Sequence, residues 1–190
     1  MSQFRTIRLG LGVALLTLAG CETPAREAPA QPGVLYRQLL RTLYRGTVPT
    51  VPVAALALEL RQPQPPLLLD VRTAAEFRVS HLAGARFVAY DSIAHATFAD
   101  LDRATPVVVY CSVGVRSERL GERLHALGFG RVRNLYGGLF EWVNEGQPVE
   151  NAAGPTLDVH PYSTFWGSWL RRGHKAYEPT EPNIERPASR

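Results

Sequence analysis

Short apolar runs alternate with helical patterns over most of the chain after Gly46. The clearest candidates for buried strands are residues 67–69 and 107–110, and weaker ones are 87–90, 132–135 and an edge strand within 47–52. Helical patterns occupy the stretches between them, at residues 53–60, 73–79, 117–127 and 139–145. Because strands and helices alternate, we predict an α/β fold in which helices cover both faces of a parallel sheet.

Residues 34–46 carry a separate pattern, that of an amphipathic helix. Leucine recurs on one face and arginine on the other, at Leu35, Leu39 and Leu43 and at Arg37, Arg41 and Arg45. Gly46 would end this helix. We expect the helix to pack on the domain, and the alternative is a basic helix that touches anionic lipid.

The first 21 residues have the features of an export signal. Arg5 and Arg8 precede an apolar run at residues 9–18, which is shorter than the roughly 20 apolar residues needed to span a bilayer. Residues 18–21, Leu-Ala-Gly-Cys, resemble the lipobox of bacterial lipoproteins. This resemblance implies that residues 1–20 are a lipoprotein signal peptide and that Cys21 is acylated as the first residue of the mature chain.

The lipobox also implies a location in the cell envelope. Acyl chains on Cys21 would attach the protein to a membrane, and the proline- and alanine-rich residues 21–33 would form a flexible tether to a domain that faces the periplasm or the exterior. Glu22 stands where an aspartate is often associated with retention in the inner membrane. The outer membrane is therefore the favoured site of attachment.

Composition and charge narrow the classes of function. The chain has 190 residues, of which 45% are hydrophobic, and this content is typical of one domain with a full core. The net charge is +4, and loss of Arg5 and Arg8 with the signal peptide leaves a mature charge near +2. No basic field typical of nucleic-acid binding remains, so we expect no nucleic-acid partner.

Cysteine usage points to a single reactive thiol. The domain holds one cysteine, Cys111, because Cys21 belongs to the lipobox. A disulfide framework, a CxxC redox pair and a zinc site all need more cysteines or histidines at closer spacing. We therefore expect no metal and no bound cofactor.

Cys111 lies where a predicted strand meets a predicted helix. The strand at 107–110 leads into the loop 111–117, Cys-Ser-Val-Gly-Val-Arg-Ser, at the sheet edge where open α/β folds bind ligands. Amides and the partial positive charge of the following helix N-terminus would stabilise a thiolate, and Arg116 could hold the oxygens of a thiosulfate-like anion. Such a thiolate can attack a sulfane sulfur and retain it as a persulfide. From position alone, a buried core cysteine is an equal alternative.

Four motifs, in order, resemble the rhodanese family over residues 47–150. They are residues 68–72 (Leu-Leu-Asp-Val-Arg) with 76–77 (Glu-Phe), residues 81–85 (His-Leu-Ala-Gly-Ala), the loop 111–117, and residues 135–138 (Leu-Tyr-Gly-Gly) with Trp142. The resemblance implies a rhodanese-like five-stranded parallel sheet flanked by helices and a catalytic Cys111 that forms a covalent persulfide. It implies a sulfurtransferase with a small sulfur-containing anion as donor, thiosulfate- or persulfide-like, and a thiol, cyanide or protein acceptor.

The motif residues fall into two groups. The loop is expected to bind the substrate through Ser112, Val113, Gly114, Val115, Arg116 and Ser117. Structural support is assigned to Asp70, Arg72, Glu76, His81, Gly137 and Gly138. Arg72 and Glu76 are expected to form an ion pair because they lie four residues apart at a helix start. For Asp70, the alternative to structural support is a direct part in catalysis. His95 and His125 are expected to face solvent.

Two other functions compete with sulfur transfer. Cysteine-dependent phosphatases and arsenate reductases place five residues between cysteine and arginine, whereas four separate Cys111 from Arg116. The smaller loop suits one sulfur better than a tetrahedral phosphoryl group. A non-catalytic persulfide carrier or partner-binding module is the nearer alternative, and without a second thiol in the domain it needs an outside acceptor.

Residues 151–190 form an extension outside the resemblance. They combine aromatic and basic side chains at Tyr162, Phe165, Trp166, Trp169, Arg171 and Arg172. We expect this part to pack over the domain or against the helix at 34–46, and the alternative is contact with a membrane or partner. Residues 178–190, with three prolines, are expected to be disordered.

Overall fold

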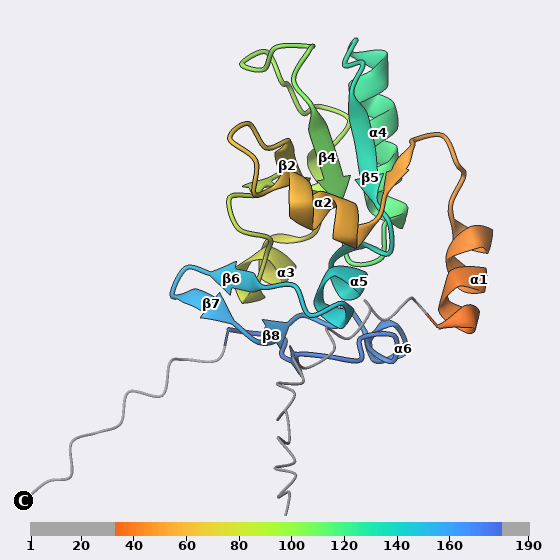
Figure 1. Cartoon of the computed structure of the whole chain (residues 1–190), viewed down its shortest axis with the longest axis vertical. Helices are drawn as coiled ribbons and strands as arrows, with labels where there is room; N and C mark the ends of the chain where they lie inside the picture. Colours follow the sequence, from red (N-terminus) through yellow and green to blue (C-terminus); the bar gives the residue numbers. More distant parts are fainter. Residues whose placement is uncertain (1–32, 180–190) are drawn as a thin grey trace, which may run out of the picture.

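A five-stranded parallel sheet forms the centre of the computed structural model, which describes residues 33–179. The strand order is β1-β5-β4-β2-β3 (Figure 1). The strands are β1 (Thr50–Val51), β2 (Leu67–Asp70), β3 (Arg86–Phe87), β4 (Val107–Tyr110) and β5 (Val132–Leu135). Every neighbouring pair is parallel, so the predicted α/β fold is confirmed.

Side chains of the central strands alternate between two cores. Leu68 and Val108 belong to the core that contains residues of α1 (Val34–Leu43), α2 (Val53–Glu59) and α5 (Gly138–Asn144). Leu69 and Val109 belong to the opposite core, with residues of α4 (Val115–Ala126). Because both faces are covered, β4 is apolar at nearly every position and entirely buried.

The predicted helices and most strands lie within two residues of their expected places. The helices are those of the two cores together with α3 (Ala74–Val79). The strand expected at residues 87–90 is wrong in its placement, because β3 ends at Phe87 and Tyr90–Ser92 form a short 3-10 turn, η1. β3 pairs only with the last two residues of β2, and the ladder stops where β2 ends.

α1 packs on the domain, as expected, and Leu39 of the predicted leucine face packs against the core. Tyr36 and Leu40 are buried in the core, whereas Leu35 is 72% exposed. Tyr36 stacks on Trp169 of the C-terminal extension, with ring centroids 5.3 Å apart. The extension therefore covers part of the helix that the domain alone does not reach.

Residues 149–179 fold back across one end of the sheet. β6 (Val149–Asn151) and β7 (Gly154–Thr156) form an antiparallel hairpin, β8 (Asp158–Val159) pairs in parallel with β9 (His174–Lys175), and α6 (Thr164–Gly167) lies between these two strands in the chain. Figure 1 shows β8 and α6 on the side toward which the arrow of β4 points. Trp166 and Leu170 pack against the core, which confirms the expected packing of the extension.

The predicted signal peptide, Cys21 and nearly all of the tether lie outside the described residues, as does most of the tail expected to be disordered. Within residues 33–179, no helix has both the length and the apolar character needed to cross a membrane.

Candidate active site

Cys111 directly follows β4, at the carboxyl edge of the sheet. The residue is 1% exposed, and its Sγ accepts a hydrogen bond from the N–H of Gly114 at 3.1 Å. Cys111 belongs to the lining of a cavity of about 180 Å³. The cysteine is therefore nearly buried, yet it borders a partly open space in which a small molecule can bind.

Gly114 gives the loop its turn. Its φ of 96° lies in the left-handed region, which favours glycine, and this residue also caps the N-terminus of α4. A Cβ atom added at Gly114 would overlap the hydroxyl group of Tyr44. Both the backbone conformation and the lack of space therefore require glycine beside the sulfur.

The N-terminus of α5 holds the loop from the other side. The N–H groups of Leu139 and Phe140 donate to the carbonyl oxygens of Cys111 and Ser112, at 2.8 and 3.0 Å. A Cβ on Gly138 would overlap the Cys111 carbonyl oxygen, so glycine permits this close approach. Gly137 and Gly138 thus form a turn against the loop.

Arg116 is bound tightly to Glu76. Its two terminal nitrogens donate to the two carboxylate oxygens, Nη1 to Oε2 at 2.8 Å and Nη2 to Oε1 at 2.6 Å. Ser112 Oγ donates to Glu76 Oε1 at 2.6 Å and accepts from Arg116 Nη2 at 2.9 Å. Burial favours the neutral acid, but Arg116 and the other donors outweigh it and lower the pKa of Glu76 to about 2.

The turn before α3 places Glu76 for this role. Thr73 Oγ1 accepts the N–H of Glu76 at 3.2 Å, and Glu76 Oε2 accepts the N–H of Thr73 at 3.0 Å, which completes a capping box. One carboxylate therefore both starts α3 and anchors Arg116.

The predicted ion pair between Arg72 and Glu76 is wrong. Arg72 precedes α3, and its side chain folds back to bind Asp70, Nη2 to Oδ2 at 2.6 Å and Nε to Oδ1 at 2.9 Å, with both side chains fully buried. Arg72 Nη2 also donates to the carbonyl oxygen of Ser80 at 2.5 Å. Asp70 does not line the Cys111 cavity, and this pair instead joins the end of β2 to the end of α3.

None of the three histidines considered from the sequence lines the Cys111 cavity. The N–H of His81 donates to the Glu150 carbonyl oxygen at 2.8 Å, and its Nδ1 lies 2.9 Å from the Phe77 carbonyl oxygen. His81 thus binds backbone groups, in agreement with its assignment to structural support. His95 and His125 are exposed, as predicted.

Asn134 and Tyr44 support the loop and were not predicted from the sequence. Asn134 Oδ1 accepts from Ser117 Oγ, and its Nδ2 donates to the Gly114 carbonyl oxygen, both at 2.8 Å. Tyr44 Oη donates to the carbonyl oxygen of Val113 at 2.7 Å. Asn134 was a detectable signal, because a polar side chain interrupts a buried strand.

The extension contributes side chains to the cavity. Tyr162 and Trp166 line it together with Leu43 of α1, and the Tyr162 ring centroid lies 4.9 Å from Cζ of Arg116. The sequence showed the aromatic residues of the extension but gave no sign that they reach the cysteine loop. Their contact depends on how the chain folds back after β7.

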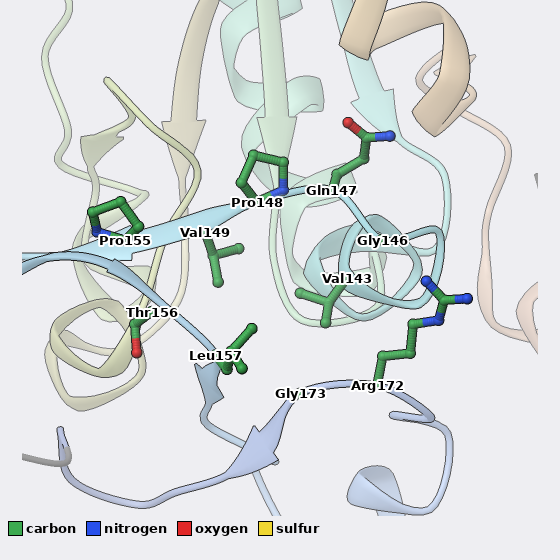
Figure 2. Close-up of a pocket in the computed structure, with 10 residues that line it drawn as sticks. All are labelled: Val143, Gly146, Gln147, Pro148, Val149, Pro155, Thr156, Leu157, Arg172 and Gly173. Atoms are coloured by element: carbon green, nitrogen blue, oxygen red, sulfur yellow. The ribbon is translucent and has the colours of Figure 1, made fainter.

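A larger cavity of about 550 Å³ lies elsewhere. Figure 2 shows Val143, Val149 and Leu157 around it, with Arg172 at its edge. It shares no lining residue with the Cys111 cavity. Its larger volume therefore does not make it part of the cysteine site.

Comparison with known proteins identifies the fold and the family. A family model for the rhodanese-like domain matches residues 53–145. A sulfurtransferase of Allochromatium vinosum is 32% identical over 95 residues, which span 50% of this chain and 88% of that protein. The thiosulfate sulfurtransferase GlpE of Pseudomonas putida is 35% identical over 99 residues, spanning 52% of this chain and 87% of that protein.

A solved structure supports the fold independently. The BH2092 protein of Bacillus halodurans superposes with a TM-score of 0.51 at 24% identity, covering 63% of this chain and 86% of that one. The curated relatives match over most of their own length at more than 30% identity, and they are sulfurtransferases. Together with the order of the strands, these similarities show that the chain belongs to the rhodanese family.

Proposed function

We propose that the protein transfers a sulfane sulfur through a persulfide on Cys111. One observation carries the proposal: Cys111 lines a cavity, and its Sγ accepts the Gly114 N–H at 3.1 Å. A buried sulfur with an amide donor and an open space beside it fits a nucleophile better than a packing residue.

The transfer has two steps, each of which replaces one bond to sulfur. The Cys111 thiolate attacks the sulfane sulfur of the donor, the S–S bond of the donor breaks, and its electron pair leaves with the rest of the donor, as sulfite in the case of thiosulfate. An acceptor such as cyanide then attacks the outer sulfur of the persulfide, and thiocyanate leaves. The thiolate is regenerated without a net proton, oxidant or reductant.

The protein itself supplies position and shielding. The carbonyl groups of Cys111 and Ser112 are held by amides of α5, and the Arg116–Glu76 pair fixes the far end of the loop. These contacts hold the backbone of the loop in one arrangement, as a preorganised attack requires.

Steady-state turnover of thiosulfate and cyanide by the full chain tests the proposal, with Cys111→Ser as the control. We expect turnover that the substitution abolishes, and a mass increase of one sulfur atom on Cys111 after incubation with the donor alone. A sulfur adduct without turnover would instead support a persulfide carrier. Absence of both would overturn the proposal.

We also propose that Cys21 carries the lipid that holds the protein in the cell envelope. The lipobox of residues 18–21 supports this attachment. Labelled fatty acid should be incorporated into the protein in cells and lost in Cys21→Ser. After membrane fractionation, the unaltered protein should be recovered in the outer-membrane fraction. Recovery of unlabelled protein that is not attached to a membrane would contradict the proposal.

A further inference from the structure

The walls of the Cys111 cavity are largely apolar and aromatic. Val113 and Val115 come from the cysteine loop, while Leu43, Tyr162 and Trp166 come from outside the segment that matches the family. The cavity therefore owes much of its lining to α1 and the C-terminal extension. This lining, rather than the shared loop, is where selection among sulfur donors can arise.

The one cation in this lining is already neutralised. Arg116 forms two hydrogen bonds with the carboxylate of Glu76, at 2.6 and 2.8 Å. The ring of Tyr162 also lies against its guanidinium group, 4.9 Å from Cζ. A small dianion such as thiosulfate would lose much of its hydration here and gain no uncompensated positive charge from the lining residues.

Tyr162 is held in place by a local arrangement of the backbone. Its φ of 62° makes it the one non-glycine residue of 33–179 with a positive φ. Its N–H donates to Nδ1 of His160 at 3.0 Å, and the His160 ring packs edge-on to Tyr177. An unfavourable conformation that the surroundings enforce is typical of functional positions. Tyr162 is 49% exposed, so a ligand that enters the cavity can reach its ring.

The cavity volume matches one ring rather than a large ligand. It is about 180 Å³, and an apolar cavity of about 150 Å³ is known to bind benzene. A ring held between Trp166 and Tyr162 would leave its attached sulfur close to Cys111. Contact with aromatic side chains would favour such a ring over a methyl group.

We propose that the preferred donor is an organic sulfane-sulfur compound with one apolar or aromatic group and a single negative charge. This inference rests on the proposed sulfur transfer through Cys111. With a thiosulfonate, the thiolate attacks the terminal sulfur, the bond between that sulfur and the sulfonyl sulfur breaks, and the electron pair leaves with the sulfinate. Charge and atoms balance, and no oxidant or proton is required.

Three donors test the proposal with the full chain and cyanide as acceptor: benzenethiosulfonate, methanethiosulfonate and thiosulfate. The first two have the same thiosulfonate group and the same charge, and they differ only in that one carries a phenyl group and the other a methyl group. We expect kcat/KM to be higher for the phenyl compound by roughly ten-fold or more, because the ring is buried on binding. Thiosulfate should be the poorest donor.

Substitutions separate the effect of the walls from that of intrinsic reactivity. In Trp166→Ala and Tyr162→Ala, the ratio of kcat/KM for benzenethiosulfonate to kcat/KM for methanethiosulfonate should fall several-fold. The intrinsic reactivity of the two donors is the same with every variant, so a change in this ratio reports the cavity walls. Leu157→Ala is the control, because Leu157 is an apolar residue of the same extension, 66% exposed, that does not line the cavity. Circular dichroism and thermal unfolding should show that each variant folds.

The outcomes of the two proposals are distinguishable. The proposed donor class would be overturned if Cys111-dependent turnover showed no preference for the phenyl compound. It would also be overturned if neither Trp166→Ala nor Tyr162→Ala reduced that preference. Sulfur transfer through Cys111 would stand in both cases. Lack of Cys111-dependent turnover with all three donors would instead remove the proposed function.

Discussion

The hydroxyl group of Tyr44 donates a hydrogen bond of 2.7 Å to the carbonyl oxygen of Val113, inside the cysteine loop. The Tyr44 hydroxyl oxygen in turn accepts the N–H of Gly137 at 2.9 Å. Burial raises the pKa of Tyr44 well above its usual value, so the hydroxyl remains protonated and able to donate. One side chain from the segment after α1 therefore joins the loop to the turn before α5.

Tyr44→Phe removes both hydrogen bonds and leaves a carbonyl and an amide without their partner. We expect the free energy of unfolding to fall by about 1–3 kcal/mol. Turnover with thiosulfate should also fall, because the loop loses a contact beside Gly114. Urea unfolding and steady-state rates measure the two effects.

Tyr136→Phe is the matched control for this change. The Tyr136 ring packs edge-on against Tyr44, with centroids 5.9 Å apart, and it does not supply the hydrogen bonds by which Tyr44 joins Val113 to Gly137. Equal effects of the two substitutions would contradict a role for the Tyr44 hydroxyl.

Gly138→Ala tests the close approach of α5 to the loop. A Cβ there would overlap the Cys111 carbonyl oxygen, and the φ of 58° already disfavours alanine. We expect a loss of about 1–2 kcal/mol from the backbone and a further 1–3 kcal/mol from the overlap, with a sharp fall in turnover.

Gly84→Ala isolates the backbone part of that loss. Gly84 has a φ of 71°, and nothing lies within 4 Å of an added Cβ. The Gly84→Ala variant should lose only the part of the unfolding free energy that comes from backbone strain, and its turnover should be unchanged. Similar unfolding energies and rates for the two variants would show that the contact between α5 and the loop is unimportant.

Local patterns predicted the sheet because its strands are short apolar runs. All four residues of β4 are buried, and its bounds were predicted correctly from the valine run alone. The same reasoning misplaced β3, which is set by where β2 stops rather than by its own side chains. It also missed Tyr36 and Leu40 as the buried residues of α1, and Tyr36 stacks on Trp169 from far along the chain.

The site was predictable in its loop and not in its surroundings. Cys111 at the end of β4 follows from a strand that leads into a loop and a helix. The partner of Glu76 was misassigned because spacing along a helix suggested Arg72, whereas Arg116 lies 40 residues away and meets it only in the folded chain. Tyr162 could not be placed at the cavity by any local pattern.

Glu76→Gln should weaken the protein in a way that depends on pH. The pKa of Glu76 is about 2 in the folded protein against an ordinary value of 4.5, so the charged form stabilises the fold. This contribution is complete above about pH 4.5 and is lost as the pH falls toward 2. At neutral pH we expect the variant to be less stable by up to about 3–5 kcal/mol, since Arg116 loses its buried partner.

Urea unfolding from pH 7 down to pH 3 measures the difference between this variant and the unaltered chain. The difference in unfolding free energy should be constant at the higher pH values and should shrink in the acid range. A difference that stays the same in acid would show that the charge of Glu76 does not stabilise the fold. Glu178→Gln, an exposed change outside the site, is the control.

Glu145, the C-cap residue of α5, makes stability depend on pH in the opposite direction. Burial, with the nearby charge of Glu141, raises the pKa of Glu145 to about 6 against an ordinary 4.5. The charged form therefore destabilises the fold, and stability is lost as the pH rises through 6. Because Glu145 is partly exposed, solvent screening limits the effect, and we expect Glu145→Gln to be more stable by about 0.5–1 kcal/mol at neutral pH. Thermal and urea unfolding should show this gain above pH 7 and almost none near pH 4.5, and a gain of equal size at both values would mean that the substitution acts through packing rather than charge.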